Sequence, residues 1–333
     1  MDQPLAENKA DTPLRLGCAG LGFIFRFAHS AAIRYLQKRG WPVEVTALCD
    51  QRQEAVDDAL GHFPGARATR SLDDLLGAAT EFDALAISLW PPLSLAFLEQ
   101  AIDAGVKAIL VEKPVAENVA DIRRVAEKAR RAGVRVHVAY NRLYHPGMAG
   151  FSQALKTMGA IESASVSLLR ENRQEAIFYK DVTPHAVGML HRLFGKLTVE
   201  TASLSPPKQP GALPKSLEAV LRSECGARVT LDIQPGSGCH LEHYSVWAGN
   251  ECIELPFLSG ETAEDAGWWR TLAGVREFHP VPAPAGLEDT APWRMGYLDQ
   301  MADFLRGAET PAGNACCLDE AAQILELRDA IFA

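Results

Sequence analysis

The chain has 333 residues, more than one ordinary core contains, so two domains are expected. Its 47% hydrophobic and 23% charged residues argue against a disordered or fibrous protein. The formal net charge of −9 argues against a nucleic-acid partner, because such binding depends on clustered lysine and arginine. The N-terminus is polar and long apolar runs are missing, which predicts a cytoplasmic protein without membrane association.

The first part of the chain alternates short apolar runs with helical stretches, as repeated β-α-β units do. Helices are predicted over 28–39, 93–104 and 119–132, and the last two close near Gly105 and Gly133. We therefore expect a flexible N-terminus over 1–12 and a doubly wound Rossmann domain with a parallel sheet over 13–140. Its strands are predicted over 14–18, 43–49, 84–88, 108–111 and 134–138.

After residue 140 the pattern changes to alternating apolar and polar residues separated by glycine-rich turns, which is typical of antiparallel strands. Residues 141–333 are expected to form an α+β domain for substrate binding and oligomerisation, built on an open, mainly antiparallel sheet. One face of such a sheet lacks a cover, which predicts a homodimer or homotetramer through it. Strands are predicted over 161–169, 219–222, 228–233, 244–248 and 252–255, helices over 184–193, 295–305 and 319–331, and long loops over 205–215 and 280–292.

Gly20 and Gly22 follow the first predicted strand and precede a predicted helix. In the dinucleotide fingerprint the first glycine permits a tight turn, and the second lets the backbone approach the pyrophosphate. Phe25 stands where the fingerprint has its third glycine. The loop between them adds Phe23 and Ile24 as expected cofactor contacts.

Asp50 ends the second predicted strand, where a carboxylate accepts hydrogen bonds from the adenosine ribose. This position favours NAD as the cofactor. Arg52 follows two residues later and can bind a 2′-phosphate through a charge-assisted contact, so NADP remains possible.

Further motifs follow in chain order: Trp90-Pro91, Glu112-Lys113-Pro114, Asn141-Arg142 and Asp181-Val-Thr-Pro-His185. Together they resemble the glucose-fructose oxidoreductase / inositol dehydrogenase / MocA (Gfo/Idh/MocA) family, over about residues 14–195. The resemblance implies an NAD(P)-dependent dehydrogenase or reductase acting on CH–OH groups. It also implies cofactor contacts from Trp90, Pro91, Glu112 and Lys113, catalysis by Lys113, Asp181 and His185, and substrate contacts from these three with Asn141 and Arg142.

The proposed catalytic residues also suit the chemistry of alcohol oxidation. Removing hydride from an alcohol carbon requires a base for the hydroxyl proton, and imidazole titrates near neutral pH. Thr183-Pro184 reads as a helix N-cap and first residue, which predicts that His185 lies in the first turn and is kept neutral by the helix dipole. Lys113 is expected to hydrogen-bond the reacting oxygen, and Asp181 to orient the histidine or bind a neighbouring hydroxyl.

The expected substrate is a secondary alcohol or ketone of a sugar, polyol or related cyclic compound. The family often has histidine where Leu95 stands and an acidic residue where Gly188 stands, so the substrate class is less constrained than the reaction. Two alternatives stay open: the same scaffold acting on an imine or in redox-assisted elimination or glycoside cleavage, and a non-catalytic ligand-sensing regulator that binds nucleotide. No metal is expected, because His240 and His243 are spaced to point to opposite faces of a strand.

Overall fold

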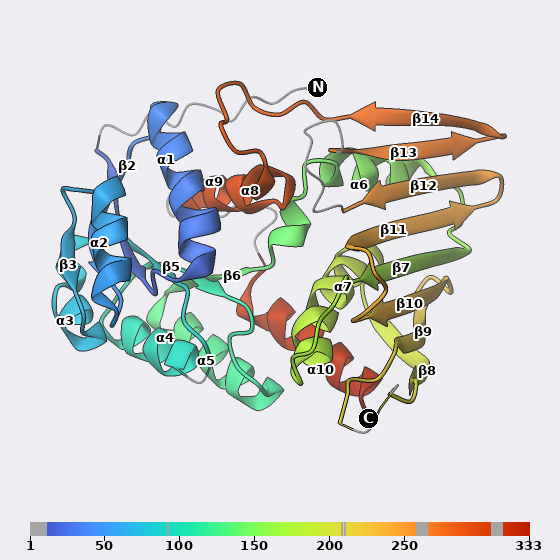
Figure 1. Ribbon diagram of the computed structural model, residues 1–333, viewed down its shortest axis with the longest axis horizontal. Helices are drawn as coiled ribbons and strands as arrows, with labels where there is room; N and C mark the ends of the chain where they lie inside the picture. The colour runs from blue at the N-terminus through green and yellow to red at the C-terminus, as the bar shows by residue number, and fades with distance from the viewer. Residues whose placement is uncertain (1–11, 92, 208, 210, 258–265, 308–315) are drawn as a thin grey trace. The chain divides into compact units, whose positions relative to one another are not determined.

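The computed structural model describes residues 12–91, 93–207, 209, 211–257, 266–307 and 316–333 (Figure 1). Residues 1–11, predicted to be a flexible N-terminus, lie outside the described residues. The chain divides into two compact units. The first comprises Met1–Asn141 with Tyr297–Ala322, and the second comprises Arg142–Gly296 with Gln323–Ala333. The described residues of Tyr297–Ala322 therefore pack with the first unit. The single boundary expected at residue 140 does not include this return of the chain.

The first unit contains a six-stranded parallel sheet in the order β3-β2-β1-β4-β5-β6, which confirms the Rossmann prediction (Figure 1). Its core strand β5 is buried along its whole length, as expected where helices cover both faces. The strands are β1 (Leu14–Ala19), β2 (Val43–Cys49), β3 (Arg67–Thr69), β4 (Ala84–Ile87), β5 (Ala108–Glu112) and β6 (Arg135–Ala139).

The order of the strands reverses between β1 and β4. From β1 the chain runs outward to β2 and β3, whereas from β4 it runs outward to β5 and β6. Right-handed crossovers then place α1 on one face of the sheet and α4 and α5 on the other. The carboxyl ends of β1 and β4 therefore form the switch point at which open parallel sheets bind ligands.

The helices of the first unit follow the predicted order, with additions. The sequence did not indicate β3, α2 or α3, which follow Asp50. The helices are α1 (Ser30–Lys38), α2 (Gln53–His62), α3 (Leu72–Gly77), α4 (Leu93–Asp103), α5 (Val119–Ala132) and α9 (Tyr297–Gly307), joined by the short helices η1 (Phe25–His29) and η2 (Ala79–Glu81), while α10 (Leu318–Ile331) begins in this unit and ends in the second.

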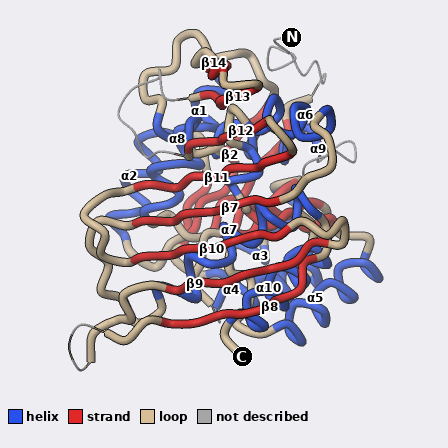
Figure 2. The backbone as a smooth tube through the Cα atoms, turned by 90° about the vertical axis from the view of Figure 1, so that its right-hand side faces the viewer, coloured by secondary structure: helices blue, strands red, loops and turns tan. Residues whose placement is uncertain are grey.

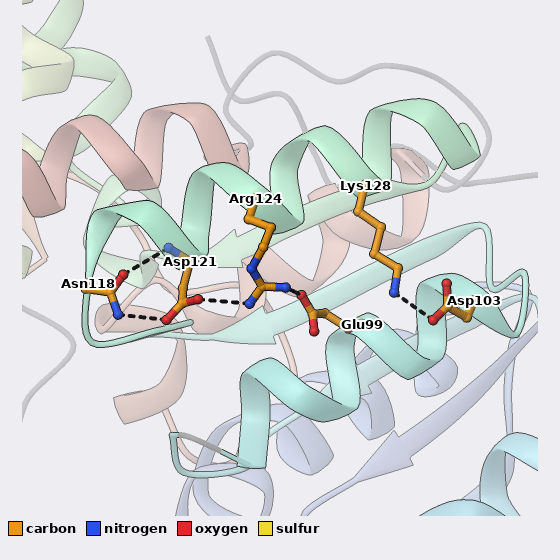
Figure 3. Close-up of polar contacts among 6 residues, drawn as sticks. All are labelled: Glu99, Asp103, Asn118, Asp121, Arg124 and Lys128. Atoms are coloured by element: carbon orange, nitrogen blue, oxygen red, sulfur yellow. Dashed lines mark hydrogen bonds and ion pairs between the residues drawn. The ribbon is translucent and has the colours of Figure 1, made fainter.

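Helices α4 and α5 are joined on their outer surface by ion pairs (Figure 3). Asn118 caps α5 by accepting a hydrogen bond from the Asp121 N–H at 2.9 Å. Arg124 bridges Asp121 and Glu99, and Lys128 Nζ lies 2.6 Å from Asp103 Oδ2. Because water screens exposed charges, these pairs align the two helices more than they stabilise the fold.

The second unit contains an eight-stranded sheet in the order β14-β13-β12-β11-β7-β10-β9-β8 (Figure 2). Only β7 and β10 pair in parallel among its neighbouring strands, so the prediction of a mainly antiparallel sheet is confirmed. The strands are β7 (Ser163–Leu169), β8 (Leu197–Leu204), β9 (Leu217–Ser223), β10 (Arg228–Gln234), β11 (Leu241–Ala248), β12 (Glu251–Pro256), β13 (Gly267–Leu272) and β14 (Val275–Pro280).

One face of this sheet packs on helices, and the other face shows the strands themselves (Figure 2). Residues of β7 alternate between the two faces, with Ala164 and Val166 buried and Ser163 and Ser165 half-buried. The sequence did not indicate β8, β13 or β14. The helices of the unit are η3 (Asn141–Tyr144), which starts at the last residue of the first unit, α6 (Met148–Thr157), α7 (Phe178–Phe194) and α8 (Ala291–Arg294).

Candidate cofactor site and active-site residues

The first glycine of the fingerprint occupies a position that only glycine fits. Gly20 directly follows β1 and has a φ of +83°, and a Cβ there would lie 2.4 Å from the Ser88 carbonyl oxygen. Its N–H donates to the Cys49 carbonyl at 2.8 Å, which ties the loop to the end of β2. A Cβ added at Gly22 would meet only the Arg52 side chain, at an ordinary contact distance of 3.7 Å. Gly20 and Gly22 thus place no side chain at these two positions of the loop, next to the switch point.

The loop leads into η1, a π-helical segment, and then into α1. Phe25, which replaces the third glycine, is 1% exposed and packs near Phe63 at a ring-centroid distance of 6.5 Å. Phe25 therefore contributes to the hydrophobic core of the first unit. Phe23 is 68% exposed and stacks on Phe27 at 5.4 Å, so of the two expected loop contacts it is the more accessible, while Ile24 is half-buried.

The structure brings Asp50 to the glycine loop and pairs it with Arg52. Asp50 Oδ2 accepts hydrogen bonds from the Leu21 N–H at 2.8 Å and from Arg52 Nη2 at 3.1 Å. Its Oδ1 accepts from the Arg52 N–H at 2.9 Å and from Arg52 Nε at 3.1 Å. Burial raises the pKa of Asp50, but the hydrogen bonds from Arg52 and Leu21 outweigh it and lower the pKa, so the carboxylate is charged.

The pairing with Arg52 limits what else the Asp50 carboxylate can bind. The four hydrogen bonds use the acceptor positions of the Asp50 carboxylate, so a ribose hydroxyl reaches it only if the Arg52 side chain moves. Arg52 is 46% exposed and has the room to do so. Asp50 and Arg52 thus lie at the same place, where the carboxylate suits a ribose hydroxyl and the guanidinium suits a phosphate.

Two further expected cofactor contacts lie beyond β4. Trp90 is 74% exposed, although an indole normally packs against other residues, and its carbonyl accepts from the Ser94 N–H at 3.0 Å to start α4. Pro91 lies beside it and is half-buried. Such exposure of a large apolar ring at the binding edge of a parallel sheet marks a surface available to a ligand.

Glu112 and Lys113 lie at the carboxyl end of β5 and just beyond it. Glu112 is the last residue of that strand and is 9% exposed, and Lys113 is half-buried and precedes a cis-proline, Pro114. The His29 Nε2 atom lies 2.9 Å from Glu112 Oε1. Sequence reasoning did not single out His29, which is 83 residues from its partner.

Asp181 and His185 lie on α7 of the second unit, and the predicted start of this helix was wrong. The helix begins at Phe178, so Pro184 lies inside it and Thr183 is no N-cap. Thr183 Oγ1 instead donates to the Tyr179 carbonyl at 2.6 Å, one turn earlier. His185 is therefore past the first turn, and the argument that the helix dipole keeps it neutral does not hold.

The corrected helix start has a second consequence. Asp181 and His185 are four residues apart in the same α-helix, so they share one face of it. His185 is 7% exposed and Asp181 is half-buried. Gly188 lies three residues beyond His185 on the same helix and brings no acidic side chain there.

The expected substrate contacts Asn141 and Arg142 are both buried, at 1% and 8% exposure. The Arg142 guanidinium lies 3.2 Å from Glu242 Oε2 and 5.0 Å from the centre of the Phe257 ring. Arg170 also pairs with Glu242, at 3.0 Å, and the two arginines lower its pKa against the opposing effect of burial. Arg142 thus belongs to a buried charge network inside the second unit, and its predicted contact with substrate stays a prediction.

No group of three or more His, Cys, Asp and Glu residues suited to a metal ion occurs among the described residues. His243 Nε2 lies 3.3 Å from Glu254 Oε1 on the open face of the sheet. None of the helices that the structure describes combines the length and apolarity needed to cross a bilayer.

A model of a known protein family matches the N-terminal part of the chain. Residues 14–140 match the family described as "Oxidoreductase family, NAD-binding Rossmann fold". This model is that of the NAD-binding domain of the Gfo/Idh/MocA family, the family that the sequence motifs resemble.

Curated relatives are similar over part of their length. An inositol 2-dehydrogenase/D-chiro-inositol 3-dehydrogenase of Shouchella clausii is 27% identical over 60% of this chain and 59% of its own. A D-apiose dehydrogenase of Paraburkholderia graminis is 30% identical over 49% of this chain and 46% of its own. The chain thus spans about three fifths of the first relative and less of the second.

Solved structures match over nearly the whole chain. The dehydrogenase MviM from Clostridium difficile has a TM-score of 0.80 at 14% identity, covering 96% of this chain and 98% of its own. KijD10, a 3-ketoreductase from Actinomadura kijaniata in complex with NADP, has a TM-score of 0.77 at 18% identity, covering 96% and 97%. At these identities the likeness establishes the fold.

Proposed function

We propose that the protein is an NAD(P)-dependent dehydrogenase or reductase that transfers hydride between the nicotinamide and a secondary alcohol or ketone of a sugar, polyol or related cyclic compound. The observation that carries the proposal is a NAD-binding Rossmann domain of this family with Glu112-Lys113-Pro114 intact at the end of β5. A regulator that only binds nucleotide would have no use for a lysine beside the nicotinamide end of the site.

Each of the three catalytic residues has a chemical role in this proposal. His185 removes the hydroxyl proton of the alcohol, and returns it in the reverse direction. Asp181, one helical turn away on the same face of α7, orients the imidazole or binds a neighbouring hydroxyl. Lys113 donates a hydrogen bond to the reacting oxygen and offsets the negative charge that develops on it. The nicotinamide, when bound, supplies or accepts the hydride.

The proposed substrate class draws on the relatives. The curated relatives are dehydrogenases of inositols and of D-apiose, which are compounds with several hydroxyl groups. The buried Asn141 and the half-buried Asp181 offer amide and carboxylate groups that suit hydroxyl recognition.

The function is tested by nucleotide binding followed by turnover. We expect tryptophan fluorescence of the stripped protein to be quenched by NADH, and a panel of inositols, pentoses and hexoses to include a substrate that reduces NAD. Asp50→Ala is expected to weaken NADH at least tenfold, because the ribose loses its acceptor, and Arg52→Ala is expected to weaken NADPH selectively. Binding of neither nucleotide would contradict the proposal. A nucleotide that copurifies and never exchanges points to redox-assisted elimination.

We also propose that the protein forms a homo-oligomer through the open face of the eight-stranded sheet. Ser165 lies in the middle of that face, opposite Ser245 of β11 and Thr230 of β10. The small side chains at the centre of this face suit sheet-on-sheet packing. Light scattering is expected to give the mass of a dimer or tetramer for the wild type and a lower mass for Ser165→Arg. A monomeric wild type would contradict this proposal.

A further inference from the structure

His29 forms a buried pair with Glu112 that the proposed chemistry does not use. The His29 Nε2 and Glu112 Oε1 atoms are 2.9 Å apart, and the side chains are 2% and 11% exposed. His29 is the last residue of η1, directly after the glycine loop, whereas Glu112 ends β5 and precedes Lys113. The contact therefore joins the segment expected to hold the pyrophosphate to the strand that carries the catalytic lysine.

Packing alone does not account for a histidine at this position. Its second ring nitrogen, Nδ1, is buried and has no hydrogen-bond partner among the described residues. A buried nitrogen without a partner is unfavourable, and an apolar side chain of similar size would avoid that loss. The contribution of this imidazole is thus the single hydrogen bond that its Nε2 atom makes with the carboxylate of Glu112.

The ring of His29 is held in one orientation by its neighbours in the first unit. Tyr297 of α9 meets it edge-on, with ring centroids 6.0 Å apart and an interplanar angle of 85°. Tyr297 also meets Phe27 edge-on at 6.4 Å, and Phe27 stacks on Phe23 of the glycine loop. The wide turn of the π-helical η1 brings Phe27 and His29 to the same tyrosine, and π-helical turns often occur at functional sites.

Glu112 keeps one oxygen for another partner. Within the described residues the Glu112 carboxylate bonds His29 through its Oε1 atom. The Oε2 atom does not belong to the fully buried atoms without a hydrogen-bond partner. The sheet order β2-β1-β4-β5 indicates what lies above it. With the adenosine at the end of β2 and the pyrophosphate at β1, the nicotinamide half of the dinucleotide extends over β4 and β5.

We infer that His29 is a positioning residue that fixes the Glu112 carboxylate so that its Oε2 atom accepts a hydrogen bond from the nicotinamide half of the cofactor. The inference rests on the proposed function and adds a residue that lies outside the family motifs. A carboxylate anchored through one oxygen presents the other in a fixed direction, which aligns the nicotinamide beside Lys113. The adenine half, bound near Asp50, does not depend on this contact.

A pair of amide variants separates this role from a general structural one. The side-chain nitrogen of His29→Gln reaches about as far as Nε2 and keeps a donor for Glu112, whereas that of His29→Asn is too short. We expect the dissociation constant of NADH to rise about tenfold in His29→Asn and less than threefold in His29→Gln. ADP, which carries only the adenine half, is expected to bind both variants within twofold of the wild type, measured by calorimetry.

A double-mutant cycle with Glu112→Gln completes the test. Because both residues act on the same contact, His29→Asn combined with Glu112→Gln is expected to weaken NADH no further than Glu112→Gln alone. Equal losses of NADH and ADP affinity in His29→Asn, equal behaviour of the Asn and Gln variants, or additive effects in the cycle would each overturn the inference. The wild type serves as the control for the proposed function. If it binds both ADP and NADH tightly, a result that overturns the role of His29 leaves the proposed nucleotide binding intact.

Discussion

Replacing Lys113 with methionine is expected to lower kcat by about 10²–10³-fold while NADH affinity changes less than tenfold. Methionine keeps the length of the side chain and its apolar stem but removes the ammonium group. The reacting oxygen then loses the hydrogen bond that offsets its developing charge, a contact that matters most in the transition state. Steady-state kinetics with NAD and the best polyol substrate measures kcat, and fluorescence titration measures NADH affinity.

Lys107 supplies a matched control for this substitution. It is an exposed lysine just before β5, at the opposite end of the strand from Lys113. Lys107→Met is expected to leave kcat within twofold, because it removes the same charge from a place remote from the cofactor edge. A Lys113→Met enzyme with undiminished kcat would show that another group stabilises the reacting oxygen, and would favour a nucleotide-binding regulator over an enzyme.

The parallel sheet was predictable because each strand carries its own signal. Buried strands such as β4 and β5 are short runs of apolar residues, and each precedes a helix with a recognisable end, as at Gly133 of α5 with its φ of +64°. The predicted bounds of these strands differ from the observed ones by at most one residue. Strand β3 escaped notice because it has only three residues, and its apolar signal is too short to detect.

The predicted elements were wrong or missing where one sequence pattern is compatible with two local structures. Thr-Pro is the usual start of a helix, but at Thr183-Pro184 the threonine hydroxyl bonds back to Tyr179, and the helix continues through the proline. Strands β13 and β14 carry bulky residues that pack across the hairpin, such as Trp269 on Phe278 at 4.7 Å. Without knowledge of that pairing, their sequence looks like the flanks of a loop.

In the candidate site, too, residues marked by local sequence were predictable, whereas contacts between residues far apart in the sequence were not. Gly20, Asp50 and Lys113 are recognisable because each follows a strand end, where the fold places ligand-binding residues. The pairing of His29 with Glu112 depends on residues 83 positions apart and leaves no periodic trace in the sequence. The pair between Arg142 and Glu242 was equally hidden in the sequence, because it forms only when β11 is placed beside β7.

Replacing Gly20 with alanine is expected to destabilise the protein by more than about 2 kcal/mol and to abolish NADH binding. Two effects combine at this residue. A φ of +83° is unfavourable for any side chain, and the added Cβ would lie 2.4 Å from the Ser88 carbonyl oxygen, a backbone atom that cannot rotate away. Ser88 also donates its N–H to the Ala19 carbonyl at 2.8 Å, so relief of the clash requires the ends of β1 and β4 to separate.

Gly40 allows the two effects to be measured separately. It has a φ of +79° in the turn after α1, and a Cβ there meets nothing within 4 Å. Gly40→Ala is therefore expected to cost about 1 kcal/mol from backbone strain alone and to leave NADH affinity unchanged. Urea unfolding of both variants gives the two free energies. If Gly20→Ala cost no more than Gly40→Ala and still bound NADH, the close approach of β1 and β4 would not shape the cofactor loop, and its glycine would serve the turn only.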